Sequence, residues 1–344
     1  MAETKNVLLT FDYELFQGTR SGTVANCMLR PTDKILDVLG KHGATSIFFI
    51  DMMYVVRLHE AAAKYTKAKN DFDAIETQII RMAEEGHYVF NHLHPHWLDA
   101  IYKEETNQWQ LTDTSKYAFS SLAEQQQTQV FEASMKLLNE ILAKAKRKLL
   151  ADGFRAGGLY IQPFTAFKPH FDKHGIKYDF SVLLGATGSL ENKSGSFDFT
   201  GIKKVIYPFW NDIAIENANG EYKEYALRIA YIPFSFRLLN SVFYRLNKNK
   251  PNHQKYGDGV STHNKINFPS LVPLGSSETF SIEMLNAVKI SVYLSELNQT
   301  KYLHILSHPK LVSAYNIELM DKLLKKISAS GKAEFDFKKF SLPA

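Results

Sequence analysis

The stretch "NVLLTFDYE", residues 6–14, joins an apolar run to two acidic residues at its end. A short apolar run of this kind is typical of a buried strand, and its polar residues then lie at the C-terminal tip of the strand. The stretch "HYVFNH", residues 87–92, has the same design and ends in histidine. Buried strands that end in Asp, Glu and His indicate a parallel sheet with its functional residues at the C-terminal ends of the strands.

Apolar runs and amphipathic segments alternate along the rest of the chain. Further strands are expected at 44–53, 153–158, 176–184, 203–210 and 301–309. Helices are expected at 31–43, 71–87, 121–149, 163–175, about 280–297, and 316–331. Strands that alternate with helices form parallel sheets through right-handed crossovers. The sequence therefore predicts an α/β fold: a distorted barrel of seven or eight β/α units with parallel strands, decorated by a long insertion.

The 344 residues are expected to form one barrel domain with insertions at about 99–119 and 211–277. Within the second insertion, residues 226–250 are basic and strongly aromatic. One interpretation is an extra lid or cap that packs on the barrel. The other is a surface for peripheral contact with a membrane that carries a lipid-linked substrate.

Composition excludes several classes of protein. The net charge of +5 is not gathered in a basic stripe, so a nucleic-acid partner is not expected. Cys27 is the single cysteine, which excludes an intrachain disulfide and a cysteine-based zinc motif. No apolar run has the length of a signal peptide or a transmembrane helix, so a cytoplasmic location is expected.

The expected strand ends carry the candidate functional residues, which are Asp12, Glu14, His92, His94, His96, Arg155 and His308. A parallel barrel brings such ends to one mouth. On a helical turn, the spacing of His92 and His96 would put both rings on one side, with His94 pointing away. Two histidines and one carboxylate form a familiar catalytic metal set with open positions.

Asp12 and Glu14 are two residues apart, so both side chains would project from the same face of a continuing strand. They either cap the following loop or divide two tasks, one binding a metal and the other accepting a proton from water. Arg155 would keep the free carboxylate ionised, or else form a buried structural ion pair. His308 follows an apolar strand and is either structural or catalytic.

The ordered set of motifs resembles the polysaccharide deacetylase family, also called the NodB-homology or carbohydrate esterase family four group. The motifs are "TFDYE", "HLHPH", "RAGGL" from Arg155, and "LHILSHP", with "YDFSV" at Asp179 and "YPFWND" at Trp210 and Asp212 as looser matches. The resemblance runs from residue 5 to about 330. Tyr13, Leu93 and the pair Ala156-Gly157 depart from the usual motifs, which bears on specificity more than on mechanism.

The resemblance implies a divalent metal ion, zinc or a related ion, on Glu14, His92 and His96. It implies that Asp12 is the base that deprotonates water, although the swapped assignment of Asp12 and Glu14 stays open. Arg155 would orient Asp12.

The resemblance also implies roles for residues around the metal. The backbone N–H of Gly158 would stabilise the oxyanion, and His308 would protonate the leaving amine. Asp179 and Trp210 would belong to the wall of the substrate pocket.

The expected function is metal-dependent removal of an acetyl group from an N-acetylated sugar. The substrate would be a polysaccharide or a biosynthetic intermediate, either nucleotide-linked or lipid-linked. Two alternatives are a hydrolase of non-sugar amide bonds on the same barrel and a catalytically silent glycan-binding barrel.

Overall fold

The computed structural model describes residues 4–18, 20–111, 115–190, 195–260, 266–267 and 276–340. The stretches 112–114, 261–265 and 268–275, which belong to the two expected insertions, lie outside the described residues.

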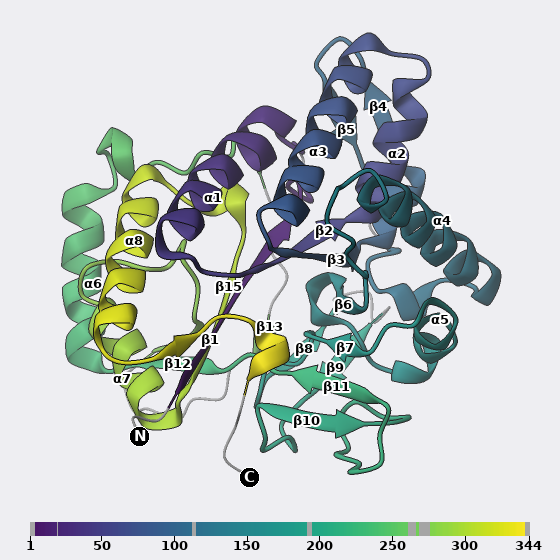
Figure 1. Cartoon of the computed structure of the whole chain (residues 1–344). Helices are drawn as coiled ribbons and strands as arrows, with labels where there is room; N and C mark the ends of the chain where they lie inside the picture. The colour runs from purple at the N-terminus through teal and green to yellow at the C-terminus, as the bar shows by residue number, and fades with distance from the viewer. Residues whose placement is uncertain are drawn as a thin grey trace.

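A nine-stranded sheet forms the centre of the molecule (Figure 1), in the order β10-β11-β7-β6-β3-β2-β1-β15, with β16 also paired to β1. The strands are β1 (Lys5–Tyr13), β2 (Ile47–Asp51), β3 (Tyr88–Leu93), β6 (Gly153–Ala156), β7 (Tyr178–Asp179), β10 (Ile206–Phe209), β11 (Tyr222–Tyr225), β15 (Tyr302–Ser307) and β16 (Ala333–Glu334). All neighbours are parallel except β10 and β11. The central strands are buried on both faces, as parallel sheets covered by helices require.

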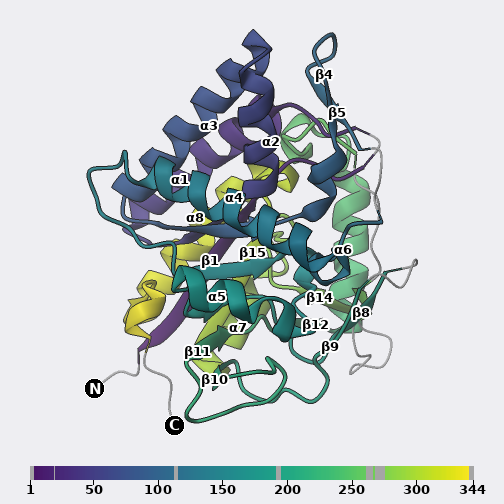
Figure 2. The ribbon, with the colours of Figure 1, turned by 90° about the vertical axis from the view of Figure 1, so that its right-hand side faces the viewer.

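Helices cover this sheet from outside (Figures 1 and 2). They are α1 (Arg30–His42), α2 (Met52–Ala62), α3 (Thr66–Glu84), α4 (Glu124–Leu142), α5 (Lys168–His174), α6 (Phe234–Asn247), α7 (Ile290–Thr300) and α8 (Ala314–Ala329). Smaller elements are the hairpin β4 (Ile101–Lys103) and β5 (Gln108–Gln110), the sheet of β8 (Thr187–Ser189), β9 (Ser196–Asp198) and β13 (Ile266–Asn267), and the pair β12 (Ile229–Ile232) and β14 (Ser276–Thr279).

The main sheet is curled, and side chains join its two ends. The Tyr302 hydroxyl of β15 donates to the carbonyl oxygen of Ala226, just after β11, at 3.2 Å. The Nδ1 atom of His304 lies 3.3 Å from the same oxygen. The predicted α/β fold with a mostly parallel, barrel-like sheet is therefore confirmed.

The register of the parallel strands lines up polar residues at one edge of the sheet. Asp51 of β2 lies opposite His92 of β3, and His92 lies opposite Arg155 of β6. Asp12 of β1 lies opposite Phe49, two residues before Asp51. Strands that are distant in sequence thus deliver their polar ends to one place.

The stretch 211–277 differs from the expected insertion because it contributes β11 to the main sheet. The sequence of β11, "YKEY", looks like a polar loop. Its Glu224 is nevertheless fully buried beside Asp179, which explains why apolar patterning does not reveal the strand. The stretch 99–119 contains the β4–β5 hairpin.

Several helices also depart from the sequence-based expectations: α6 has no counterpart among them, and α4 ends at Leu142 rather than at 149. α2 is absent from those expectations, because "MMYVVRLHEAA" follows β2 directly and continues its apolar run. The Asp51 side chain caps α2 by accepting from the backbone N–H of Tyr54. α7 begins at Ile290 rather than near 280. Within the described part of the chain, no helix is both long and apolar enough to cross a bilayer.

Two glycines provide a matched test of the packing. A Cβ atom on Gly153 of β6 would lie 2.4 Å from the Phe90 ring, whereas one on Gly40 of α1 would meet nothing within 4 Å. Gly153→Ala should lower the free energy of unfolding by about 1–3 kcal/mol through overpacking. Gly40→Ala should raise it by about 0.4–1 kcal/mol. Denaturant titration measures both, and equal effects would contradict this view of the β3–β6 contact.

Candidate metal centre and active site

Three buried side chains from the ends of β1 and β3, which flank β2, meet at one point: Glu14, His92 and His94. The Nε2 atoms of His92 and His94 are 2.9 Å apart. The Oε2 atom of Glu14 lies 2.8 Å from His94 Nε2 and 3.5 Å from His92 Nε2. Three tetrahedral ligands about 2.1 Å from a zinc-sized ion would be separated by about 3.4 Å. The triangle therefore has nearly the size that one ion requires.

The hydrogen bond of His92 prepares its ring for metal binding. Its Nδ1 atom lies 2.8 Å from the carbonyl oxygen of Arg155. A carbonyl oxygen can only accept, so Nδ1 carries the proton, and Nε2, which faces Glu14 and His94, is the atom that would bind a metal ion once deprotonated. Metal-bound histidines are commonly oriented in this way.

His94 reaches the group because the backbone stays extended after β3. Its φ and ψ are −113° and 97°, so His92 and His94 project from the same side. A Cβ atom on Gly157 would lie 2.6 Å from the Nδ1 atom of His94, so only glycine leaves room for this ring. Burial lowers the pKa of His94 to about 4, which keeps it in the neutral form that binds metals.

His96 lies next to this group rather than in it. The helical turn that was expected to align His96 with His92 begins only at Pro95, so the spacing argument does not hold for the extended residues before it. The His96 ring stacks on Tyr117, with ring centroids 5.9 Å apart, and both of its buried ring nitrogens have no hydrogen-bond partner among the described residues.

Asp12 lies beside the three candidate ligands and is held by Arg155. The guanidinium donates from Nη1 to Asp12 Oδ1 at 2.6 Å. The other oxygen, Oδ2, is 3.9 Å from His92 Nε2 and 3.8 Å from His308 Nε2. Burial raises the pKa of Asp12, but the charge of Arg155, together with His92 and His308, brings it below its usual value. Asp12 is therefore ionised, with one oxygen directed toward the site.

His308 completes the cluster from the end of β15. Its side chain is 26% exposed, and its Nε2 atom lies 3.8 Å from both Asp12 Oδ2 and Glu14 Oε1. Its Nδ1 atom pairs with Glu283 Oε1 at 2.9 Å. Burial lowers the pKa of His308, but Glu283, Asp12 and Glu14 raise it above its usual value. The raised pKa favours the protonated form of His308, which lies at the solvent side of the site.

Three side chains that shape this site were not among the residues expected from the sequence. Lys310 donates from Nζ to Glu14 Oε1 at 2.8 Å and so leaves Oε2 of Glu14 to the histidines. Asp51 accepts from Trp97 Nε1 at 2.5 Å, and burial and the charge of Glu14 raise its pKa to about 7. Glu283 comes from a loop. Asp51 could have been found at the end of "IFFID" and Lys310 in "SHPKL", but nothing in the sequence singles out Glu283.

The remaining predicted site residues have different positions. Gly158 lies on the loop after β6 with φ of 60°, where a Cβ atom would be 2.7 Å from Tyr117. Asp179 is buried inside the barrel, and its Oδ1 accepts from the backbone N–H of Ser181. Trp210 stacks on Tyr222 at 5.8 Å, and Lys168 Nζ lies 4.3 Å from the centre of its ring. None of these contacts joins Asp179 or Trp210 to the three candidate ligands.

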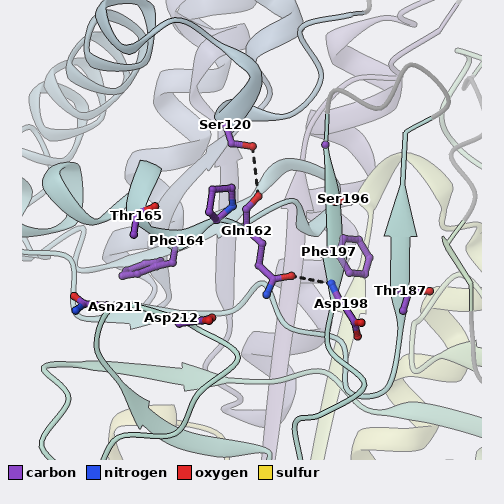
Figure 3. Close-up of a pocket in the computed structure, with 12 residues that line it drawn as sticks. Ser120, Gln162, Phe164, Thr165, Thr187, Ser196, Phe197, Asp198, Asn211 and Asp212 are labelled. Carbon is purple, nitrogen blue, oxygen red and sulfur yellow. Dashed lines mark hydrogen bonds between the residues drawn. The ribbon is translucent and has the colours of Figure 1, made fainter.

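A polar cavity of about 750 Å³ lies beyond the loop that follows Gly158. Figure 3 shows Gln162 at its centre, where the side-chain Oε1 accepts from the backbone N–H of Asp198 at 2.7 Å. Asn211 and Asp212, which follow Trp210, line the cavity as well. Tyr160 and Phe197, with ring centroids 5.4 Å apart, stand between the Gly158 loop and this cavity.

Several solved structures are similar to the chain. One is a protein described as a polysaccharide deacetylase from Mycobacterium smegmatis, with 11% identity, a TM-score of 0.49, and coverage of 97% of this chain and 87% of that one. Another is a family 4 carbohydrate esterase from Streptomyces lividans, with 10% identity, a TM-score of 0.40, and coverage of 99% and 97%.

A 4-alpha-glucanotransferase from Thermococcus litoralis is similar as well, with 9% identity and a TM-score of 0.50. The match covers 99% of this chain and 42% of the glucanotransferase. No protein-family model and no curated protein sequence matches the chain. At these identities the likeness concerns the fold, so the chemistry has to be argued from the residues of the site.

An experiment can decide whether His94 or His96 is the second histidine ligand of the metal. His94→Ala should remove tight binding of a divalent ion, because its Nε2 forms one corner of the ligand triangle. His96→Ala should retain the ion, because its ring lies outside that triangle. Metal content of the purified variants, measured after loading with zinc or cobalt, decides between them. Loss of the ion from His96→Ala and its retention in His94→Ala would restore the spacing-based assignment.

Proposed function

We propose that the protein is a metal-dependent deacetylase that removes an acetyl group from an N-acetylated sugar. The observation that carries this proposal is that Asp12 and Glu14, two residues apart, have different partners. Glu14 lies against the imidazoles of His92 and His94, whereas Asp12 is held through one of its oxygens by Arg155. A hydrolase that activates water needs this pair, with one carboxylate to hold a cation and one to accept a proton.

The residues present fit a divalent ion in the position between Glu14, His92 and His94. Two nitrogens and one carboxylate oxygen suit zinc and related ions. When bound, such an ion would polarise the acetyl carbonyl and lower the pKa of a water molecule. Asp12 would take the proton from that water at Oδ2, while Arg155 keeps Oδ1 and fixes the orientation of the carboxylate.

His308 is suited to deliver a proton to the departing amine. Its Nε2 atom faces Asp12 and Glu14, and its Nδ1 atom is held by Glu283. A partly exposed imidazole whose pKa is raised stays protonated near neutral pH, as a general acid must. The backbone N–H of Gly158 is proposed as the donor to the oxyanion. Its glycine conformation allows a close approach of substrate to the backbone.

The substrate class is proposed from the resemblance of the site residues to the motifs of polysaccharide deacetylases. A hydrolase of non-sugar amides would use the same residues, and a silent glycan-binding barrel would use none of them. Acetate release from a panel of acetylated sugars, with and without a chelator, tests the proposal. If the metal-loaded protein releases acetate from none of these sugars, the proposed deacetylase activity is rejected.

Asp12→Asn should leave the metal content unchanged and reduce kcat by about 10²–10⁴-fold, the usual contribution of a general base. Glu14→Gln should instead lose the ion. Metal analysis and acetate release are measured together, below the unfolding temperature of each variant, because Asp12→Asn also leaves Arg155 without its buried partner. Loss of the ion from Asp12→Asn and its retention in Glu14→Gln would exchange the two roles.

Glu283→Gln should move the alkaline limb of the pH profile of kcat to lower pH. Glu283 raises the pKa of His308, so removing its charge lowers this pKa, and the protonated acid is lost earlier as pH rises. The acid limb, which reports Asp12, should stay in place. Glu318→Gln, which changes an exposed carboxylate on α8, is the control. An alkaline limb that does not move would rule out His308 as the acid.

A further inference from the structure

Large apolar side chains of the described residues gather, exposed, on the outer face of α6. They are Phe234, Leu238, Leu239, Val242 and Leu246. Four of them recur every fourth residue from Phe234 to Leu246, so they follow one side of the helix. Figure 1 shows α6 at the edge of the molecule, beside α8.

The opposite side of α6 is already packed against the protein. The Phe243 ring stacks on Tyr315, with ring centroids 5.7 Å apart, and Asn240 accepts from Asn286 at 2.9 Å. Phe236 packs against the main core. A helix that is apolar on both sides is normally buried on both. Here Leu238 is 57% exposed and Leu246 is 72% exposed, so the outer side is built for a partner.

The charges around this face restrict the partner. Residues 234–250 carry four basic side chains and no Asp or Glu. On a helical wheel, Arg237 and Arg245 lie along one border of the apolar stripe. Lys248 and Lys250 follow at its C-terminal end. A second copy of the chain would bring the same positive charges against this face, which disfavours self-association. A bilayer with anionic headgroups offers both an apolar layer and opposite charge.

We propose that α6 docks its outer face onto the surface of an anionic membrane, lying in the plane of the headgroups. The helix is 14 residues long, which is too short to cross a bilayer. This inference does not depend on the proposed deacetylase activity. The contact would lie close to the candidate active site, because a cavity of about 420 Å³ behind α6 is lined by Asn240 and Phe243 on one side and by Glu283 on the other.

Sedimentation of the full chain with vesicles tests the proposal. The protein should bind vesicles of phosphatidylcholine with phosphatidylglycerol and bind phosphatidylcholine alone much more weakly. The double change Leu238→Ser with Val242→Ser should weaken binding at least about tenfold, because two side chains lose their burial in the membrane. Leu150→Ser with Ile215→Ser is the matched control, since it removes two exposed apolar side chains outside α6 and should bind as the unchanged protein does.

A second pair of variants tests the charge. Arg245→Gln with Lys250→Gln should weaken binding to the anionic vesicles by about fivefold for each charge removed, whereas Lys64→Gln with Lys136→Gln should have little effect. Circular dichroism confirms that each variant is folded. Acetate release from a soluble acetylated sugar should be unchanged in the α6 variants, so failure of membrane binding and failure of the proposed activity are distinguishable.

Two results would overturn the proposal. The first is absence of binding to anionic vesicles, or equal loss of binding in the α6 and control variants. The second combines two observations. The unchanged protein does not bind vesicles, and light scattering shows it as a dimer that the double change Leu238→Ser with Val242→Ser converts to a monomer. The second result would assign the face to another copy of the chain.

Discussion

The buried guanidinium of Arg155 is the interaction on which the rest of the barrel interior depends. It is fully buried in β6 and reaches three other strands or their ends: Asp12 and Thr10 of β1, His304 of β15, and the carbonyl of Phe180 after β7. Its centre lies 4.1 Å from the centre of the Phe49 ring of β2. A curled sheet leaves a lumen that side chains must fill, and here a planar cation with five donors fills it.

Such a buried cation is tolerable only if the charges around it balance. Asp12 supplies one ionised carboxylate. Asp179 and Glu224 lie opposite each other in β7 and β11, and both are fully buried. Burial raises the pKa of Asp179 to about 6, and burial together with Asp179 raises that of Glu224 well above its usual value, so the pair retains a proton. This explains why Asp179, which the motif resemblance assigned to the pocket wall, lies inside the barrel as part of its charge balance.

The strands and helices that could be predicted are those whose buried residues are apolar. β1, β3 and β15 are continuous apolar runs, and this pattern alone assigns the polar residues at their ends to one mouth. β11 escapes such a prediction because it buries an acid, and α2 because its apolar residues continue a strand. Within the site, the assumption of a helical turn predicted that His94 points away from the metal. The extended backbone angles of His94 show instead that its ring lies on the same side as that of His92. Glu283 depends on a loop fold that local sequence does not encode.

Arg155 acts on the site through two separable parts of the same residue. Its side chain holds the proposed base, whereas its main-chain carbonyl fixes the tautomer of His92. Every amino acid possesses that carbonyl, so evolution could exchange the side chain at this position, together with the buried partners that balance its charge, and still keep the hydrogen bond that orients the imidazole. A descendant that loses hydrolysis in this way would keep a cation-binding pocket, which offers a short route from an enzyme to a metal-carrying relative.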